Sequence, residues 1–384
     1  MSLRNEISRR EFFAASAGLG AGLMMMGESS GADGKNEASL GAKGKVDYSF
    51  SHHHPGFKKI KVAQIGVTHA HARGKMESLR KLTDYFEVVG IYEGDPQKKT
   101  DAMNNKAYQG LRWFSSEDEL LSYSGLEAVA IEVYKKDLVA TGMRCAKAGM
   151  HIHLDKPAGE SFEKFRALLK EMVSRKLTLQ MGYMFRNNPG FQFCMEAVKK
   201  GWLGEIFEIH GVMSKTTSER KRKALSAYKG GTMFELGCHL IDILYAIMGN
   251  PDAVTGYVRQ TQPDVDGLND NQLAVFEYKE ATATIRSALA EIDGTKRRQF
   301  YVCGDKGTIE IKPLEKPKLT LVLDRDRGQF KKGTQQVELA ELTGRYDDLL
   351  IEWAKVIRGE MKDRFGPEHD LLVQACVLKA SGLM

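Results

Sequence analysis

Three polar side chains share one face of an apolar segment in the second half of the chain. In "GGTMFELGCHLIDILYAIMG", residues 230–249, Glu235, His239 and Asp242 follow one another at intervals of four and three residues, which places them on one face of a helix. A carboxylate and an imidazole one turn apart can share a proton, as general acid–base catalysis requires. Because burying such groups unpaired is costly, we interpret them as candidate catalytic residues.

A second candidate is the lysine in "HIHLDKPAGES", residues 151–161. His151 and His153 would share one face of a strand, where two imidazoles can chelate a metal ion. Helices cover both faces of a parallel sheet, however, so such histidines are more often core residues. We therefore predict no metal site. We expect the strand to deliver Lys156, with His153 nearby, to the edge of the sheet where α/β folds bind ligands.

The stretch "VAQIGVTHAHARG" has the position, but only part of the composition, of a dinucleotide-binding turn. The G-x-G-x-x-G pattern would place glycines at positions 66, 68 and 71, and here Gly66 remains while Thr68 and His71 take the other two places. Glu93 ends the next strand, 27 residues after Gly66. A carboxylate there accepts ribose hydroxyls and favours NAD over NADP. We predict that these residues, together with His69 and Lys156, form a nucleotide site.

The elements that must position these residues alternate between strands and helices in the first half of the chain. Near-continuous apolar strands separated by helices are typical of a parallel sheet covered on both faces, a doubly wound α/β domain of the Rossmann type. The predicted strands are "KIKVAQIGV", "FEVVGIYE", "LRWF", "LEAVAIEV", "MHIHLD" and "LTLQMGYM", and the predicted helices cover 72–82, a short stretch after 96, a stretch opening at 115 or 116, 137–148 and 162–175.

In the second half of the sequence the order of elements changes, and most predicted strands follow one another directly. Their β-branched and aromatic content predicts a large, mostly antiparallel open sheet in an α+β domain. The predicted strands are "GEIFEIHGVM", "AVTGYVRQT", "NQLAVFEY", "ATIRSALAEI", "RRQFYVCG", "GTIEIKP" and "KLTLVLD", with helices over 189–200, 232–248, 345–360 and 369–381. We expect "SERKRK", residues 218–223, to be a solvated loop, with a flap that attracts an anionic substrate as the alternative.

Composition excludes several classes of protein. The 384 residues carry a net charge of +6, from 56 basic and 50 acidic residues that are mixed along the chain, too weak an excess to predict a nucleic-acid partner. Length predicts two domains, and 42% hydrophobic residues suffice for their cores. The five cysteines are scattered and form no C-x-x-C motif, so we predict neither a disulfide framework nor a zinc site.

The N-terminal segment has the pattern of an export signal. Ser8 to Phe12 reads as a twin-arginine motif, and the apolar run that follows to Met26 is too short for a stable membrane anchor. We predict a signal peptide over 1–32 and a flexible linker over 33–57, in which three consecutive histidines are solvated. The Rossmann domain then covers 58–184, and a substrate-binding and dimerisation domain covers 185–384. An exported enzyme needs a tightly bound nicotinamide, because the periplasm has no soluble pool.

Two of these stretches resemble motifs of the Gfo/Idh/MocA family, the group of glucose–fructose oxidoreductase and inositol dehydrogenase. "HLDKPAGES" resembles its E-K-P motif, and "GGTMFELGCHLID" resembles its G-G-G-x-x-x-D-x-G-x-H-x-x-D segment. The resemblance runs from about Lys58 to the end of the chain. It implies a nicotinamide cofactor on the first domain, a sugar or polyol held against the second, and frequent pairing of subunits through the open sheets.

The resemblance also implies roles for individual residues. Lys156 matches the catalytic lysine, His239 the catalytic histidine and Glu235 the usual aspartate. In oxidation of a sugar hydroxyl, His239 polarised by Glu235 would accept the proton, while Lys156 would stabilise the developing negative charge. The expected substrate-binding residues are Arg186, Asn188, Asp242 and His153.

The sequence departs from the family's pattern in three places besides the glycine turn, where Thr68 and His71 replace glycines. Asp155 stands where the family has glutamate, Glu235 stands where it has aspartate, and "EVYKKDL", residues 132–138, lacks the usual threonine-proline-x-x-x-histidine. We therefore expect an exported NAD(P)-dependent oxidoreductase of a sugar or polyol, with NAD the preferred and tightly bound cofactor. The expected partners are the twin-arginine export machinery and a second copy of the chain.

Three other functions stay open. An NAD-dependent glycosidase of the same family would oxidise its sugar transiently, eliminate the aglycone and reduce the product again. A non-catalytic, exported sugar-binding protein would keep the fold without the chemistry. A metal-dependent hydrolase would use the two H-x-H pairs, His69 with His71 and His151 with His153.

Overall fold

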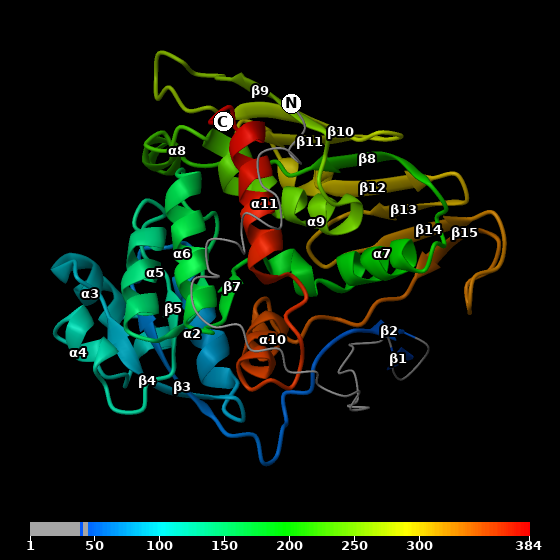
Figure 1. Cartoon of the computed structure of the whole chain (residues 1–384). Helices are drawn as coiled ribbons and strands as arrows, with labels where there is room; N and C mark the ends of the chain where they lie inside the picture. The colour runs from blue at the N-terminus through cyan, green and yellow to red at the C-terminus, as the bar shows by residue number, and fades with distance from the viewer. Residues whose placement is uncertain (1–38, 41–44) are drawn as a thin grey trace, which may run out of the picture.

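A five-stranded parallel sheet forms the N-terminal domain (Figure 1). The structure, a computed structural model, describes residues 39–40 and 45–384, so the predicted twin-arginine signal lies outside the described residues. The strand order is β4-β3-β5-β6-β7, and every pairing is parallel. The strands are β3 (Ile60–Ile65), β4 (Phe86–Tyr92), β5 (Ala128–Ile131), β6 (His151–Leu154) and β7 (Leu179–Met181).

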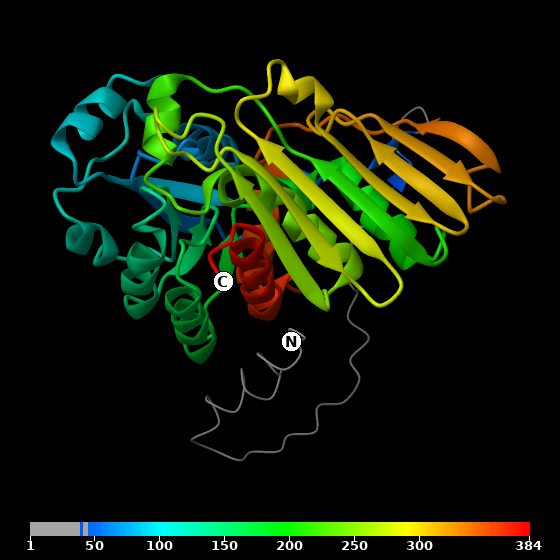
Figure 2. The ribbon, with the colours of Figure 1, turned by 90° about the horizontal axis from the view of Figure 1, so that it is seen from above.

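Helices cover both faces of this sheet, as the uninterrupted burial of β5 requires. The chain moves from β3 outward to β4, and later from β5 in the opposite direction to β6. Right-handed crossovers therefore place α2 on one face and α5 and α6 on the other (Figure 2). The helices are α2 (Ala72–Lys81), α3 (Pro96–Met103), α4 (Glu117–Leu121), α5 (Leu138–Lys147) and α6 (Phe162–Ser174).

The order of the strands reverses between β3 and β5. At such a switch point the connections leave in opposite directions and open a crevice beyond the carboxyl ends of the strands, where doubly wound sheets bind ligands. The turn after β3 and the loop after β5 both end at this crevice, and β6 ends beside them. The predicted fold class, a Rossmann-type sheet followed by a mostly antiparallel sheet, is confirmed.

The C-terminal domain is an eight-stranded sheet of order β15-β14-β13-β12-β8-β11-β10-β9. Its pairings are antiparallel except that of β8 with β11. Burial alternates along β10, as in a sheet packed on one face. The strands are β8 (Ile206–Val212), β9 (Ala253–Arg259), β10 (Asn271–Glu277), β11 (Thr282–Ala288), β12 (Gln299–Gly304), β13 (Gly307–Ile311), β14 (Leu319–Leu323) and β15 (Gly333–Val337).

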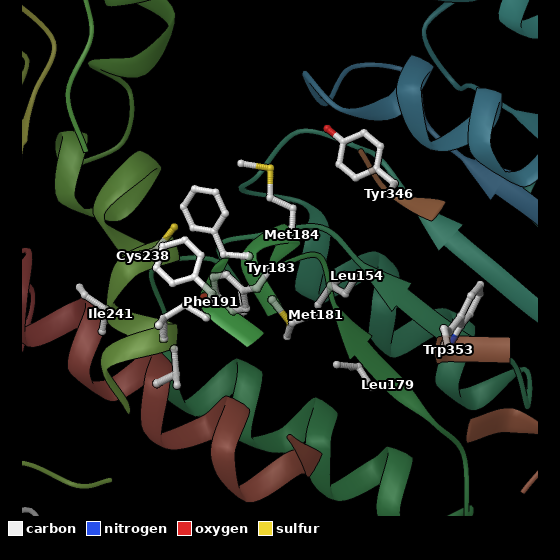
Figure 3. Packing of buried hydrophobic residues seen from close by; sticks show 14 of the residues in the cluster. Leu154, Leu179, Met181, Tyr183, Met184, Phe191, Cys238, Ile241, Tyr346 and Trp353 are labelled. Carbon is white, nitrogen blue, oxygen red and sulfur yellow. The ribbon is translucent and has the colours of Figure 1, made fainter. Parts of the chain in front are cut away.

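Three helices cover one face of this sheet and leave the other open (Figure 2). They are α7 (Pro189–Lys199), α9 (Cys238–Met248) and α11 (Gly366–Ala380). Helix α11 also packs against α6 of the first domain, and α10 (Asp347–Ile357) packs against α2. One apolar core runs through both domains. Figure 3 shows it passing from Leu154 and Met181 to Tyr183, Cys238 and Ile241.

Two local expectations were wrong, and one strand was not expected. "LRWF" makes a single bridge, between Trp113 and Ile91, rather than a strand. "SERKRK" forms most of helix α8 (Glu219–Leu225) rather than a loop, because Arg222 is buried and pairs with Asp266 and Asp270. Strand β15 was not predicted, since its sequence "GTQQV" has no apolar alternation.

The described part of the expected linker contacts the folded domains. Val46 and Tyr48 are buried, β2 (Val46–Asp47) pairs with β1 (Ser39–Leu40), and the Val46 N–H donates to the Glu338 carbonyl at 2.8 Å. The three histidines form polar contacts, His53 with Asp84 and His54 with Glu360 among them. Within the described residues, no disulfide forms, and no helix is long and apolar enough to cross a membrane.

Candidate active site

The turn after β3 keeps the geometry of a dinucleotide-binding turn at its first glycine. Gly66 has a φ of +89°, and an added Cβ would lie 2.6 Å from Val133 Cγ1 and 2.8 Å from the Glu132 carbonyl carbon. Only glycine fits this position, because any other residue would be strained at this φ and its side chain would clash with the loop after β5. The Gly66 N–H donates to the Tyr92 carbonyl at 2.8 Å, which fixes the turn against β4.

Glu93 lies beside this turn at the end of β4, as the sequence predicts. Its carboxylate accepts the Val67 N–H and the Asp95 N–H, both at 2.9 Å. A cavity of about 210 Å³ adjoins it, lined by Gly66, Thr68 and Glu93 together with residues from the ends of β4 and β5. The structure thus brings three of the predicted cofactor-binding residues together around one cavity.

The two histidines of the turn point inward and meet Asp155. His71 Nδ1 lies 3.0 and 3.1 Å from the two carboxylate oxygens of Asp155, and His69 Nδ1 lies 3.3 Å from one of them. Burial lowers the pKa of His71 to about 4, so this ring is neutral. Burial also opposes the charge on His69, but Asp155 and Glu132 outweigh it and raise the pKa of His69 to about 9.

A lysine that the motifs do not include completes this buried cluster. Lys75 of α2 is fully buried, and its ammonium group contacts His153 Nε2 and lies 3.3 Å from Asp155 and 3.5 Å from Glu132. His153, expected near the substrate, is buried between Lys75 and the Gln180 side chain. Burial holds the pKa of His153 well below its ordinary value, so it accepts a hydrogen bond from the lysine.

Two groups of side chains have the composition of a metal site. Ligand atoms of His69, His71 and Asp155 lie within 4.8 Å of one another, and so do those of Asp242, His369 and Asp370. Each group already holds a cationic side chain: Lys75 in the first and Arg186 in the second. A fixed positive charge at the centre of a ligand set lowers its affinity for a metal cation.

Lys156 extends from the end of β6 across to the second domain. It is almost completely buried, and its ammonium group donates to the Glu235 backbone carbonyl at 2.7 Å. Burial acts to lower its pKa, but the negative charge of Glu235 outweighs burial and raises the pKa above the ordinary value. Lys156 is therefore a fixed ammonium at the junction of the two sheets, and its peptide bond to Pro157 is cis.

Glu235 has a different partner from the one that its spacing predicts. It lies in a π-helical turn, Met233–Gly237, that precedes α9, and the wider winding of such a turn changes its angle to His239. Its Oε2 lies 3.3 Å from Lys135 Nζ, and among the described residues no hydrogen bond joins Glu235 to His239. Burial would raise its pKa, but Lys156 and Lys135 lower it to about 2.

His239 is held in place by aromatic rings. Its ring centre lies 6.0 Å from that of Tyr183 and 5.4 Å from that of Phe185. Burial, helped by the charge of Lys156, holds its pKa well below the ordinary value. Glu235 Oε2 has Lys135 as its ion-pair partner, whereas His239 Nδ1 is buried and has no hydrogen-bond partner within the described part of the chain. Such an unpartnered atom costs stability unless a ligand satisfies it.

The other expected substrate-binding residues are engaged with the protein itself. Arg186 donates to Asp242 through two nitrogens at 3.0 and 2.6 Å, and also to Asp370. Asn188 caps α7 through the Gly190 N–H and donates to the Leu314 carbonyl at 3.0 Å. The structure thus places Arg186 and Asp242 in one buried ion cluster, while Lys156, Glu235 and His239 remain at the junction of the domains.

Comparison with known proteins identifies the family. Residues 60–183 match the model described as "Oxidoreductase family, NAD-binding Rossmann fold", and residues 191–310 match the "GFO/IDH/MocA C-terminal domain". The chain belongs to the Gfo/Idh/MocA family of oxidoreductases. The resemblance inferred from the E-K-P-like and glycine-rich segments is therefore confirmed.

Individual Gfo/Idh/MocA relatives are distant. The chain is 25% identical over 198 residues to an uncharacterised oxidoreductase of Schizosaccharomyces pombe, which covers 51% of this chain and 53% of that protein. It is 26% identical over 211 residues to a protein of Haloferax volcanii named D-xylose 1-dehydrogenase (NADP(+)) 2, covering 52% of this chain and 61% of the relative. These alignments leave more than a third of each relative unmatched.

A solved structure shares the arrangement of both domains. The aldose-aldose oxidoreductase of Caulobacter crescentus superposes with a TM-score of 0.72 at 17% identity, covering 85% of this chain and 98% of that one. At this identity the likeness establishes the fold of the two sheets. The function of the site therefore has to be inferred from its own residues.

The nicotinamide cofactor of the Gfo/Idh/MocA family fits the residues around Gly66. The cavity beside Glu93 could hold the adenosine half, and the glycine at the turn permits close backbone approach. At the other end, the unpartnered His239 Nδ1 and the Glu235 carboxylate supply polar groups for a ligand between the domains. The cavity is present although Thr68 and His71 stand in place of the second and third glycines.

Three charged residues of the site escaped the sequence interpretation. Lys75 follows the glycine turn by one helical turn, Glu132 begins "EVYKKDL", and Lys135 lies within it. Each is a charged residue at the carboxyl end of a strand or the start of the first helix. In a doubly wound sheet these positions border the ligand crevice, and this signal could have identified them.

Proposed function

We propose that this enzyme oxidises a hydroxyl group of a sugar or polyol with NAD or NADP, and that Lys156 and His239 bind that hydroxyl. The observation that carries the proposal is the buried, unpartnered His239 Nδ1, beside the fixed ammonium of Lys156 and the carboxylate of Glu235. Support comes from the Haloferax relative, whose printed name is that of a sugar dehydrogenase.

The charges suit these roles. His239 is neutral because its pKa lies well below the ordinary value, so it can accept the hydroxyl proton. Lys156 stays protonated because its pKa is raised, so it can donate to the same oxygen and stabilise its growing negative charge. A bound nicotinamide ring supplies the acceptor for the hydride. Glu235 acts through Lys156, whose charge it maintains.

NAD is the cofactor that Glu93 favours in this proposal. Its carboxylate borders the cavity at the end of β4, where a negative charge repels the additional phosphate of NADP. The Haloferax relative is named for NADP(+), so the preference of this chain has to be measured. We expect tighter binding of NAD than of NADP, and we expect a Glu93→Gln variant to reduce the difference.

Location and assembly are also part of the proposal. The twin-arginine pattern from Ser8 to Phe12 supports export to the periplasm, and fusion of residues 1–40 to a folded reporter protein would test it. The open face of the eight-stranded sheet (Figure 2) supports pairing with a second copy. Two apolar side chains of this sheet, Phe207 on β8 and Tyr257 on β9, are about half exposed. Light scattering of the purified protein tests this pairing.

The function is tested with matched lysine variants. The purified protein is mixed with NAD or NADP and a panel of aldoses and polyols, and reduced nicotinamide is followed by absorbance. We expect Lys156→Met to lower turnover about 10²-fold or more without loss of nucleotide binding. Lys164→Met, a change of an exposed lysine on α6, should leave turnover unchanged. Equal turnover of the two variants contradicts the proposed role of Lys156.

A further inference from the structure

Cationic side chains from four separate segments are linked to one another through Glu235, Glu315 and the Ser214–Lys215 backbone. Lys135 comes from the loop after β5, and Lys215 from the segment after β8. Arg298 precedes β12, and Arg345 precedes α10. None of these four belongs to the motifs that identify the family. The grouping of these cations in one region indicates a role in ligand binding rather than in folding alone.

Lys135 is held directly against the catalytic region. Its ammonium group lies 3.3 Å from Glu235 Oε2 and 5.5 Å from the centre of the Tyr228 ring. Its side chain is 12% exposed, so it is largely withdrawn from water. Glu235 therefore has two ammonium neighbours, Lys135 at its carboxylate and Lys156 at its backbone carbonyl.

Lys215 is fixed by its backbone, but its ammonium group lacks an ion-pair partner within the described part of the chain. The Lys215 N–H donates to the Ala288 carbonyl at 3.0 Å, and Thr216 bridges to Ala290. The side chain is partly buried. Burial lowers its pKa, and Arg298 and Lys156 act in the same direction while Glu235 opposes them. An unpaired, half-buried ammonium is costly unless an anion joins it.

The remaining charges leave a positive surplus. Arg298 and Arg345 share one carboxylate, Glu315, at 2.8 and 2.7 Å. Lys135 pairs with Glu235, whose charge also acts on Lys156 and Lys215. Five cations thus face two carboxylates. Asp155 does not change this balance, because His69 and Lys75 already oppose it.

A surplus of this kind attracts and holds anions, because charges that are withdrawn from water interact more strongly than exposed ones. Helix α8 adds to the field, since Lys221 is exposed and acts on Lys215. An oxidised nicotinamide ring is itself positive and would be disfavoured among these lysines unless a negative group is bound beside it. The excess of positive charge therefore favours a substrate that carries an anionic group.

We propose that the substrate is an acidic sugar, whose carboxylate or phosphate group binds Lys215 and Lys135 while Lys156 and His239 bind its reacting hydroxyl. This inference rests on the proposed function for the position of the hydroxyl. It assigns substrate specificity to Lys215 and Lys135, and it names acidic sugars as the chemical class of the substrate. Ammonium groups form charge-assisted hydrogen bonds with either kind of anion.

The test is a binding measurement that needs no turnover. The full chain is titrated by calorimetry, at low salt and without nucleotide, with D-glucuronate, D-galacturonate, glucose 6-phosphate, glucose and galactose. At least one acidic sugar should bind about tenfold more tightly than its neutral counterpart. Tighter binding of the uronates identifies a carboxylate group, and tighter binding of the phosphate ester identifies a phosphate group.

Matched variants locate the effect. Lys215→Met should weaken binding of the acidic sugar about tenfold or more and leave binding of the neutral sugar unchanged. Lys279→Met is the control, because that side chain is 88% exposed and lies on a distant hairpin. Lys135→Met should behave like the Lys215 variant, and a change of both lysines should abolish the preference.

Several outcomes overturn the inference. It is wrong if no acidic sugar binds more tightly than its neutral counterpart, or if Lys215→Met leaves the preference intact. It is also wrong if Lys215→Met weakens binding of NAD or NADP and spares the sugar, since the lysine then serves the nucleotide. An acidic sugar that binds but is never oxidised supports this inference and contradicts the proposed oxidoreduction. Oxidation of neutral sugars alone supports the proposed oxidoreduction and contradicts this inference.

Discussion

Replacement of Asp155 by asparagine tests the buried cluster beneath the glycine turn. The carboxylate lies 3.3 Å from His69 Nδ1 and from Lys75 Nζ, and asparagine keeps the shape while removing the charge. Burial disfavours a charged His69, and Asp155 is the largest of the groups that outweigh burial and raise the pKa of His69 to about 9. Without Asp155, this histidine should lose its proton near neutrality.

The magnitude follows from the change in pKa on folding. An unfolded histidine titrates near 6.5, so a folded pKa of about 9 corresponds to about 3 kcal/mol of stability from the protonated ring. Because the folded pKa is the higher one, this contribution is complete below about pH 6.5 and is lost as the pH rises through about 9. Asp155 stays ionised over this range, since its own pKa is held well below the ordinary value.

The assay is urea unfolding of the wild type and of Asp155→Asn at several pH values between about 6 and 9.5. The difference in the free energy of unfolding should be largest near pH 6 and should shrink by about 2–3 kcal/mol at about pH 9.5. Asp84→Asn is the control, because Asp84 contacts the exposed His53 ring and such pairs contribute little.

A difference that does not change with pH would refute this account. It would mean that His69 is neutral in the folded protein, with its Nδ1 accepting the His71 backbone N–H at 3.3 Å instead. The cluster would then be held by Lys75 and Asp155, and the histidines would contribute packing rather than charge.

The remaining predictions concern the turn, the proton acceptor and metal. Gly66→Ala should lower stability by about 1–3 kcal/mol and abolish nucleotide binding, because its Cβ would lie 2.6 Å from Val133. Gly56→Ala, also at positive φ but with open space around it, should lower stability less and leave nucleotide binding intact. The pH dependence of kcat/KM should show no loss of activity as the pH falls through about 6.5, because His239 titrates well below that value. A fall there would identify another base. Mass spectrometric analysis of untagged protein should find less than one metal ion per chain, and stoichiometric metal would assign His69, His71 and Asp155 to a metal site.

The sequence predicted the fold well because both kinds of sheet leave clear signals. Buried parallel strands such as "AVAI" are continuously apolar, and the alternation of β10 marks a sheet with one covered face. The two motifs likewise located Lys156 and His239. The failures came where tertiary contacts decide. Helix α8 depends on ion pairs with the distant Asp266 and Asp270, and the sequence around α8 does not predict that pairing.

The partners of the site residues were harder to predict for the same reason. Glu235 and His239 have α-helical spacing in the sequence, but Glu235 lies in a π-helical turn, which changes the angle between the two side chains. Arg186 was expected near the substrate, and it is enclosed by Asp242 and Asp370, the second of which lies in the last helix. Spacing predicts which residues share an element, whereas the choice of partner depends on which elements pack together.

The central claim is that a nicotinamide nucleotide binds beside Lys156 and His239 and is reduced by a sugar. The most direct measurement denatures the purified protein, identifies any released nucleotide, and then measures binding of added NAD and its reduction by the sugar panel. We predict release of a nicotinamide nucleotide or binding of NAD, with sugar-dependent reduction that Lys156→Met suppresses. A protein that neither carries nor binds NAD or NADP, yet still binds sugar, would contradict the claim and identify a sugar-binding protein on this fold.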